Sequence, residues 1–427
     1  MSIDIPEINY YQVNSNTKVI FLHGGKNMFR VEILNRIGSR HENEDEYGLA
    51  HFFEHMVFKG YYKDKKITDA IDYYGCSMNA STSVDETIYW ISGSSEHSEF
   101  MIDIILQMLF EPQFPECELK NEINVVLEEL YMNQSSPDRH YYFEKVTKLY
   151  GEIDPIMTRP VIGYEENIKT FDREKLMSFY KNKYLTNEKI IIVLGNFDKQ
   201  KIKKQIEKKL SPLTPWLLTF KALERELIIN NYKNIVPGIT YIDVPQDYCN
   251  ICLSFRSINN YSCWVLTSII LSSILSSGST SRLFKLLRDK HGLTYYQNAY
   301  DVRYDDFGSF EVSFGTRPEN VQQALDIVIN ELFNFKDVNE EELEIVKNKY
   351  ETGLLADAES TMTLGNIAID YITMGKNPEF YCNMRNRIHK IKSKHINNFA
   401  SKIFKKENMS VFISCKKEIS DNLNIQL

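Results

Sequence analysis

The sequence lacks most of the features that mark a specialised class of protein. Its 50 Lys and Arg are outnumbered by 58 Asp and Glu, so the formal net charge is −8 over 427 residues. This balance argues against a protein that binds nucleic acid or attaches to membranes through a polybasic patch. Seven cysteines are scattered along the chain, and this odd number predicts a reducing compartment with no disulfide framework.

Long apolar runs and targeting signals are also missing. The N-terminus, MSIDIPEINYYQ, is acidic and has neither an early Arg nor an apolar core, so no secretory or mitochondrial address is visible. The most apolar long stretch, residues 263–278, is short and interrupted by serines, which predicts a core helix and not a membrane span. We therefore expect a cytoplasmic protein with no membrane partner.

A lone CxxC sequence, formed by Cys249 and Cys252, is the first candidate site to be weighed. The surrounding residues DYCNICLSF predict a strand, in which residues three apart point to opposite faces of the sheet. Two thiols on opposite faces cannot share a metal or a disulfide, so we assign this pair neither zinc nor redox chemistry.

The order of predicted elements indicates a duplicated α+β unit. A chain of this length is too long for one ordinary core, which favours two domains. The strand, turn and amphipathic helix of residues 87–112 recur at 309–335, and the strand at 29–39 has a counterpart at 250–259. We predict two similar α/β-roll domains, each an antiparallel-rich sheet packed against helices. Their predicted bounds are 1–213 and 236–427, joined by a proline-containing linker at 214–235.

The stretch GLAHFFEHMVFKG, residues 48–60, places two of the nine histidines four residues apart. On a helix, His51 and His55 stand one turn apart on the same face, and Glu54 lies about 60° from His51. Two such imidazoles can bind one zinc ion, and a carboxylate beside them can accept a proton from water. This H-x-x-E-H pattern is the reverse of H-E-x-x-H. The alternative is a core helix with hydrogen-bonded histidines.

Zinc needs a third protein ligand, and the helix predicted at 117–133 offers two glutamates. Measured from Val126, Glu122 falls about 40° away and Glu129 about 60°, whereas Glu128 falls about 160° away, toward solvent. A charge beside a buried stripe is costly unless it has a partner. We predict Glu129 as the ligand and Glu122 as a carboxylate that hydrogen-bonds a ligand histidine. Otherwise both lie at the edge of the stripe, solvated or paired with lysine.

Together these residues resemble the pitrilysin/insulinase family of zinc metallopeptidases, also called inverzincins. The likeness is greatest to the short-chain branch typified by mitochondrial processing peptidase and its bacterial relatives. Besides the triplet and the two glutamates, residues 38–60, 159–168 and 183–198 match the pattern of the family. One departure is Tyr61, because the family usually has Thr after the last glycine of this signature.

The resemblance implies a function for each residue of the site. One Zn²⁺ per chain would be held by His51, His55 and Glu129, with Glu54 as the catalytic base and Glu122 as the partner of a ligand histidine. The segment NASTSVDETIYW resembles the edge strand along which the family binds the substrate backbone. The substrate-binding residues implied there are Asn79, Ala80, Ser81 and Thr82.

Arg288 and Tyr295 are interpreted differently with and without the resemblance. The residues alone favour a salt-bridged helix arginine and a core tyrosine. The segment SSRLFKLLRDKHGLTYY resembles a family segment whose Arg and Tyr contact the substrate carbonyl opposite the zinc. In short-chain relatives the zinc of one chain faces the Arg and Tyr of another, and this chain carries both sets. The resemblance therefore implies a homodimer with composite active sites.

We therefore expect a zinc endopeptidase that hydrolyses short or unfolded peptides in a closed chamber. The alternative is an inactive family member that acts as a structural or binding subunit, although the triplet, Glu129, Arg288 and Tyr295 are all present. A structural helical-repeat or interaction protein is a second alternative, but the period of about 200 residues is far too long for a solenoid unit.

Overall fold

A computed structural model describes residues 7–24, 27–151, 155–211, 237–373 and 383–427. The chain divides into two compact units, each built from separate stretches of sequence. Unit 1 consists of residues 1–133, 159–226 and 355–372, and unit 2 of residues 134–158, 227–354 and 373–427. The predicted linker, 214–235, lies outside the described residues, and the predicted domain boundaries stay a prediction.

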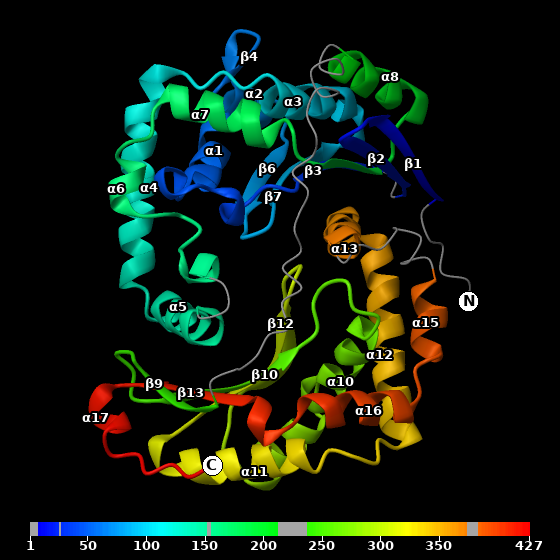
Figure 1. The fold of residues 1–427 in the computed structure, drawn as a ribbon. Helices are drawn as coiled ribbons and strands as arrows, with labels where there is room; N and C mark the ends of the chain where they lie inside the picture. Colours follow the sequence, from blue (N-terminus) through cyan, green and yellow to red (C-terminus); the bar gives the residue numbers. More distant parts are fainter. Residues whose placement is uncertain (1–6, 25–26, 152–154, 212–236, 374–382) are drawn as a thin grey trace. The chain divides into compact units, whose positions relative to one another are not determined.

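Unit 1 is built around a six-stranded sheet with the strand order β1-β2-β8-β3-β7-β6 (Figure 1). The central strand β8 is buried along its whole length, pairs antiparallel with β3, and pairs parallel with β2. β6 lies at one end of the sheet and pairs only with β7 among the described strands. The strands are β1 (Glu7–Asn14), β2 (Thr17–His23), β3 (Met28–Asn35), β6 (Ser77–Thr82), β7 (Thr87–Ser94) and β8 (Lys189–Gly195).

Helices of unit 1 cover this sheet and enclose its core. Helix α3 packs on β3 and β7, α1 packs on β6, and α8 packs on α3. Their apolar faces join the sheet in one buried cluster that includes Phe52 and Phe53 of α1, as expected for amphipathic helices on a sheet. The helices are α1 (Leu49–Val57), α2 (Ile67–Tyr73), α3 (Ser98–Phe110), α4 (Glu116–Ser135), α6 (Glu165–Ile168), α7 (Arg173–Phe179) and α8 (Lys199–Leu210), with a π-helical segment η5 (Tyr180–Tyr184) and a small hairpin of β4 (Tyr61–Tyr62) and β5 (Lys65–Lys66).

Unit 2 contains a five-stranded sheet with the order β11-β12-β10-β13-β9 (Figure 1). Its strands are β9 (Gly238–Asp243), β10 (Cys249–Ser257), β11 (Gln297–Arg303), β12 (Gly308–Thr316) and β13 (Met409–Cys415). Its helices are α5 (Pro137–Tyr150), α10 (Val265–Ser276), α11 (Val321–Phe333), most of α12 (Glu340–Glu359), α15 (Met384–His389), α16 (Ser393–Ile403) and α17 (Lys417–Ser420), with the π-helical segment η7 (Phe284–Lys290).

The two sheets share one topology, which confirms the predicted pair of similar α+β folds. In both units a buried strand near the C-terminal end of the unit lies beside the first central strand, as β8 lies beside β3 and β13 beside β10. The predicted repeat of residues 87–112 at 309–335 is confirmed: the first range contains β7 and α3, and the second contains β12 and α11. Helix α10 follows β10 as α1 follows β3, but it carries no histidine. It is the buried apolar helix predicted at 263–278.

One helix in each unit comes from the opposite half of the sequence. Helix α5 follows the N-terminal-half helix α4 but belongs to unit 2, whereas α13 (Thr361–Thr373) comes from the C-terminal half and lies largely in unit 1. In unit 2, Lys145 of α5 forms a buried ion pair with Glu311 of β12. In unit 1, Gly365 of α13 lies directly against Glu32 of β3. Each unit therefore needs both halves of the sequence to complete it.

Candidate metal centre

The helix that carries the predicted triplet begins at a backbone position that requires glycine. Gly48 precedes α1 with φ +93°, in the left-handed region that side chains rarely adopt. A Cβ atom there would lie 2.3 Å from the carbonyl oxygen of Ile162. The carboxylate of Glu42 accepts hydrogen bonds from the backbone N–H groups of Gly48 (3.0 Å) and Ala50 (2.8 Å), which satisfies donors at the start of the helix. This crowded junction fixes where the helix begins.

The structure brings the three predicted ligands together. Nε2 of His51 lies 3.7 Å from Oε2 of Glu129, and Nε2 of His55 lies 3.5 Å from the same oxygen. One ligand atom from each residue can be chosen so that all lie within 4.8 Å of one another. A tetrahedral zinc ion with ligand distances of about 2.0–2.1 Å requires ligand atoms about 3.3 Å apart. The donor set is of the type that binds zinc, and the two histidine-to-Glu129 separations of 3.7 and 3.5 Å are close to this value. Among the described residues this is the one cluster of metal-ligating type.

Glu122 holds His55 from the side opposite Glu129. Nδ1 of His55 lies 2.8 Å from Oε1 of Glu122, whose other oxygen accepts from Lys59 at 2.6 Å. This leaves Nε2 of His55 for the metal, the arrangement in which a carboxylate orients a ligand histidine. Lys59 was not predicted; it lies four residues after His55, in the turn that follows α1. By contrast, Nδ1 of His51 is buried without a hydrogen-bond partner in the described part of the chain.

Because of these contacts and their burial, the two histidines have very different pKa values. Burial, and next the charge of the neighbouring His55, lower the pKa of His51 to about 4. Burial also lowers the pKa of His55, but its hydrogen bonds to Glu122 and Glu129 outweigh this and raise it to about 9. The same bonds lower the pKa of both glutamates. Without metal the site therefore contains one protonated histidine between two carboxylates.

Glu54 is the buried carboxylate next to the ligands. It is only 8% exposed, and burial raises its pKa. The hydroxyl of Thr82 donates a hydrogen bond to Oε2 of Glu54. Thr82 was predicted to bind substrate, whereas in this structure its side chain points at the catalytic candidate. A contact between residues 28 apart cannot be read from helical or strand spacing.

The predicted substrate strand is β6, and its residues alternate between two faces. Asn79 and Ser81 are exposed, whereas Ala80 and Thr82 are half-buried on the face where α1 packs. Asn79 accepts a hydrogen bond from the backbone N–H of Ala80 at 2.9 Å. Because β6 ends the sheet, its outer edge carries backbone groups that a further strand can pair with.

Arg288 and Tyr295 lie together in unit 2. The guanidinium of Arg288 sits 5.2 Å from the centre of the Tyr295 ring and donates to the Tyr295 carbonyl oxygen at 3.2 Å. Tyr295 is 78% exposed, and Arg288 forms no ion pair with the residues described, so the interpretation as a salt bridge and a core aromatic is wrong. Arg288 belongs to the π-helical segment η7, a rare conformation that is frequent at functional sites.

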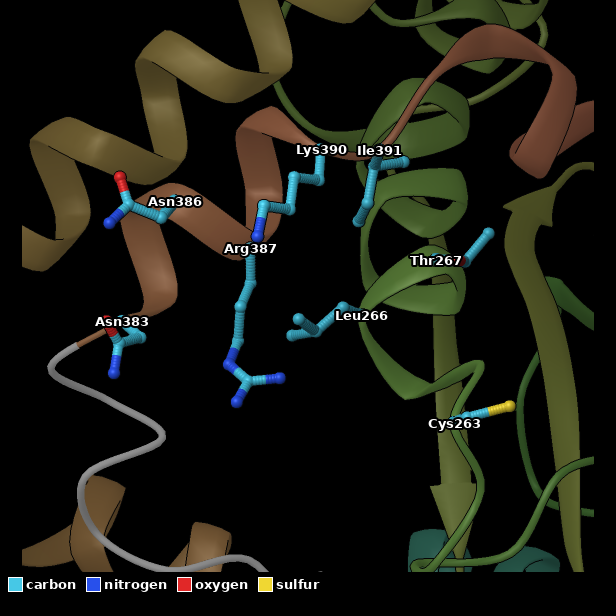
Figure 2. Close-up of a pocket in the computed structure, with 8 residues that line it drawn as sticks. All are labelled: Cys263, Leu266, Thr267, Asn383, Asn386, Arg387, Lys390 and Ile391. Carbon is cyan, nitrogen blue, oxygen red and sulfur yellow. The ribbon is translucent and has the colours of Figure 1, made fainter.

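A separate cavity of about 430 Å³ lies between α10 and α15 in unit 2 (Figure 2). Figure 2 shows the side chain of Arg387 extending into it from α15. The cavity offers no carboxylate and no histidine, so it provides neither ligands for zinc nor a base. Its lining residues are Cys263, Leu266, Thr267, Asn383, Asn386, Arg387, Lys390 and Ile391.

All six described cysteines are free, and Cys249 and Cys252 are both buried in β10 outside any metal-ligating cluster of the described residues. No helix in the described ranges is both long enough and apolar enough to cross a lipid bilayer.

Comparison with known proteins shows the family. The sequence model described as Insulinase (Peptidase family M16) matches residues 22–154, and the one described as Peptidase M16 inactive domain matches residues 170–350. An uncharacterized zinc protease of Bacillus subtilis is 27% identical over 88% of this chain and 90% of its own. One of Rickettsia felis is 28% identical over 90% and 91%. A protease from Helicobacter pylori has the same fold, with a TM-score of 0.80 at 20% identity over 96% of this chain and 99% of its own. The chain belongs to the insulinase family of peptidases, family M16.

Proposed function

We propose that this protein is a zinc-dependent endopeptidase that hydrolyses short or unfolded peptides. The observation that carries the proposal is the cluster of His51, His55 and Glu129 at distances suited to one tetrahedral zinc, with the buried carboxylate of Glu54 beside it. Relatives named zinc proteases support the choice of metal. When bound, Zn²⁺ is a Lewis acid that acidifies water and polarises a peptide carbonyl.

The chain's own residues perform the proton transfers. Glu54, whose pKa is raised by burial, accepts a proton from the attacking water and then donates it to the leaving amine. A pKa raised toward neutral suits a group that must act first as base and then as acid. Glu122 keeps His55 oriented through its hydrogen bond to Nδ1.

The edge of β6 is the proposed binding strand for the substrate. An extended peptide would add beside β6 through backbone hydrogen bonds, which give grip with little sequence selection. Asn79, Ala80 and Ser81 are the residues proposed to meet it. Such binding requires an extended chain and therefore favours short or unfolded peptides over folded proteins.

Arg288 and Tyr295 are proposed to stabilise the substrate carbonyl as negative charge develops on its oxygen. A guanidinium and a phenol hydroxyl are donors suited to an oxyanion, and removing one such donor costs on the order of 10²–10³ in rate. The contact between them holds the two residues side by side, and both side chains are exposed and can therefore reach a ligand. We propose that a homodimer supplies them to the metal site of the partner chain.

The test compares zinc content and peptide hydrolysis in single variants. We expect one zinc per chain in the wild type, with cleavage of a library of unstructured peptides. Glu54→Gln should keep the metal and lose cleavage by roughly 10²–10⁴-fold, the usual contribution of a general base. Glu129→Gln should lose both metal and cleavage.

Glu128→Gln is the matched control, since Glu128 is exposed on the same helix and should change neither property. A wild type that holds zinc but cleaves nothing would favour the alternative of an inactive family member acting as a structural or binding subunit. A wild type that binds no zinc would overturn the proposal.

A further inference from the structure

We propose that Thr82 is a positioning residue, whose hydroxyl fixes the orientation of the Glu54 carboxylate for proton transfer. The inference rests on the proposed peptidase function and deepens it. It replaces the role in substrate binding that the sequence predicted for Thr82.

The hydroxyl of Thr82 and the carboxylate of Glu54 meet where α1 crosses the end of β6. Thr82 Oγ1 donates to Oε2 of Glu54, and Glu54 is 8% exposed. A carboxylate with one oxygen held by a donor cannot turn freely about its last bond. The held oxygen is occupied, so the other oxygen is the one left to accept a proton from water. Fixing that oxygen before reaction reduces the misalignment that slows proton transfer.

Thr82 is itself held in place by a turn that is tied to the rest of unit 1. It is the last residue of β6 and is immediately followed by the turn at 83–86, which leads into β7. Several contacts secure this turn to the segment that follows β3. They are the backbone hydrogen bonds from Ser39 to Ser83 (3.1 Å) and from Arg40 to Val84 (2.9 Å), and the ion pairs Arg40–Asp85 (3.0 Å) and Arg36–Glu86 (3.1 Å).

The alternation along β6 separates the side chain of Thr82 from those of Asn79 and Ser81, two of the residues proposed to meet substrate. Asn79 and Ser81 are exposed, whereas the Thr82 side chain lies on the opposite face, toward α1. A positioning residue and a substrate contact differ in kinetics. Loss of a positioning hydroxyl lowers kcat, whereas loss of a ground-state substrate contact raises KM.

The experiment compares Thr82→Val, which keeps the shape and removes the hydroxyl, with Thr82→Ser, which keeps the hydroxyl. We expect Thr82→Val to bind one zinc per chain with wild-type affinity and to lose roughly 10–100-fold in kcat with KM changed by less than about twofold. Thr82→Ser should restore kcat to within about threefold of the wild type. A structure of Thr82→Val should show the Glu54 carboxylate in a changed or divided orientation.

Thr87→Val is the control, because Thr87 pairs with Thr82 across the two strands and donates its hydroxyl to the carbonyl of Ile37 at 2.8 Å instead. It should keep the wild-type kcat. In a Glu54→Gln background Thr82→Val should have no further effect, since the two residues act through one interaction.

Wild-type kcat in Thr82→Val, equal losses in Thr82→Val and Thr82→Ser, or a change in KM alone would each overturn the inference. A wild type without peptidase activity would instead contradict the proposed function. In that case the zinc content and the Glu54 orientation in the Thr82→Val structure still test the contact.

Discussion

Glu122 sets the protonation of the proposed metal site when no metal is bound. Its hydrogen bond to Nδ1 of His55 helps to raise the pKa of that histidine to about 9, while burial lowers the pKa of His51 to about 4. Near neutral pH the metal-free site therefore contains a protonated, positively charged His55 and a neutral His51. Zinc must displace that proton, because a ligand imidazole has to offer a free lone pair to the metal.

Zinc binding should accordingly release about one proton per chain at about pH 7.5. Calorimetric titration of the metal-free protein in buffers of different ionisation enthalpy measures this number. Below about pH 9 the zinc affinity should weaken by roughly tenfold for each unit of pH, until a further group titrates. In the metal-free fold, the stabilisation from charged His55 is complete below about pH 6.5 and is lost as pH rises through about 9.

Glu122→Gln removes the carboxylate charge from this histidine and should reduce the proton release at the same pH. Glu128→Gln, on the exposed side of the same helix, should leave it at the wild-type value. Zinc binding without proton release in the wild type would contradict the protonation assigned to His55.

The residues of the site that the sequence could identify are those set by local geometry. His51, Glu54 and His55 share one helical turn, and Glu122 and Glu129 share one face of another helix, so periodicity alone places each set. The contacts between sets depend on packing across the fold. Lys59 on Glu122 and Thr82 on Glu54 join elements whose spacing in the sequence carries no periodic signal.

At the scale of elements, the helices α5 and α13 are the least predictable part of the fold. Their apolar periodicity indicates helices, but nothing in it tells which sheet each one covers. Glu311 in unit 2 receives Lys145 of α5 together with the hydroxyl of Tyr300 at 3.0 Å. In unit 1, Glu32 is fully buried with Arg30 beside α13. Buried charges of this kind need every partner in place, so each docked helix is tied to its strand.

Substituting alanine for a glycine in α13 and in α12 should change the stability of the protein in opposite directions. A Cβ at Gly365 of α13 would lie 2.5 Å from Oε1 of Glu32, which the buried pair with Arg30 keeps from moving. Gly365→Ala should therefore destabilise the protein by about 1–3 kcal/mol. Gly353 lies inside α12 with open space around it, so Gly353→Ala should stabilise it by about 0.5–1 kcal/mol. Thermal unfolding of both variants under identical metal content measures the difference.

The two substitutions are the same chemical change on neighbouring helices, so each serves as the control for the other. A Gly365→Ala variant as stable as Gly353→Ala would show that α13 does not pack closely on β3. Similar losses in both would point to a general intolerance of substitution in these helices.

At the scale of the whole molecule, the two related units carry different candidate residues: the proposed metal ligands lie in unit 1, and Arg288 and Tyr295 lie in unit 2. Strand β3 is followed by helix α1, which carries the two histidines of the proposed metal site, whereas its counterpart β10 is followed by the apolar helix α10. The shared topology of the two halves could be predicted, because their strand and helix patterns repeat along the sequence. That each unit contains a helix from the other half of the sequence could not be predicted, because the placement of α5 and α13 depends on tertiary packing alone.

The proposed composite site makes a prediction that only a dimer can test. We expect a dimer in which Glu54 of one chain works with Arg288 of its partner. Glu54→Gln and Arg288→Ala each inactivate both sites of a homodimer. A heterodimer of the two variants, isolated through different affinity tags, rebuilds one intact site from two chains and should have about half the wild-type activity. Sites contained within single chains would leave the same heterodimer inactive.

The reciprocal heterodimer places both substitutions on one chain and pairs it with a wild-type chain. A composite arrangement then spoils both sites, because the intact Glu54 meets the substituted Arg288 and the intact Arg288 meets the substituted Glu54. Sites within single chains would instead leave the wild-type partner working, with about half the activity of the wild-type dimer. The two heterodimers must therefore give opposite results under either arrangement. Equal activity in both would mean that Arg288 does not act with Glu54 at all, and a monomeric active enzyme would remove the basis of the proposal.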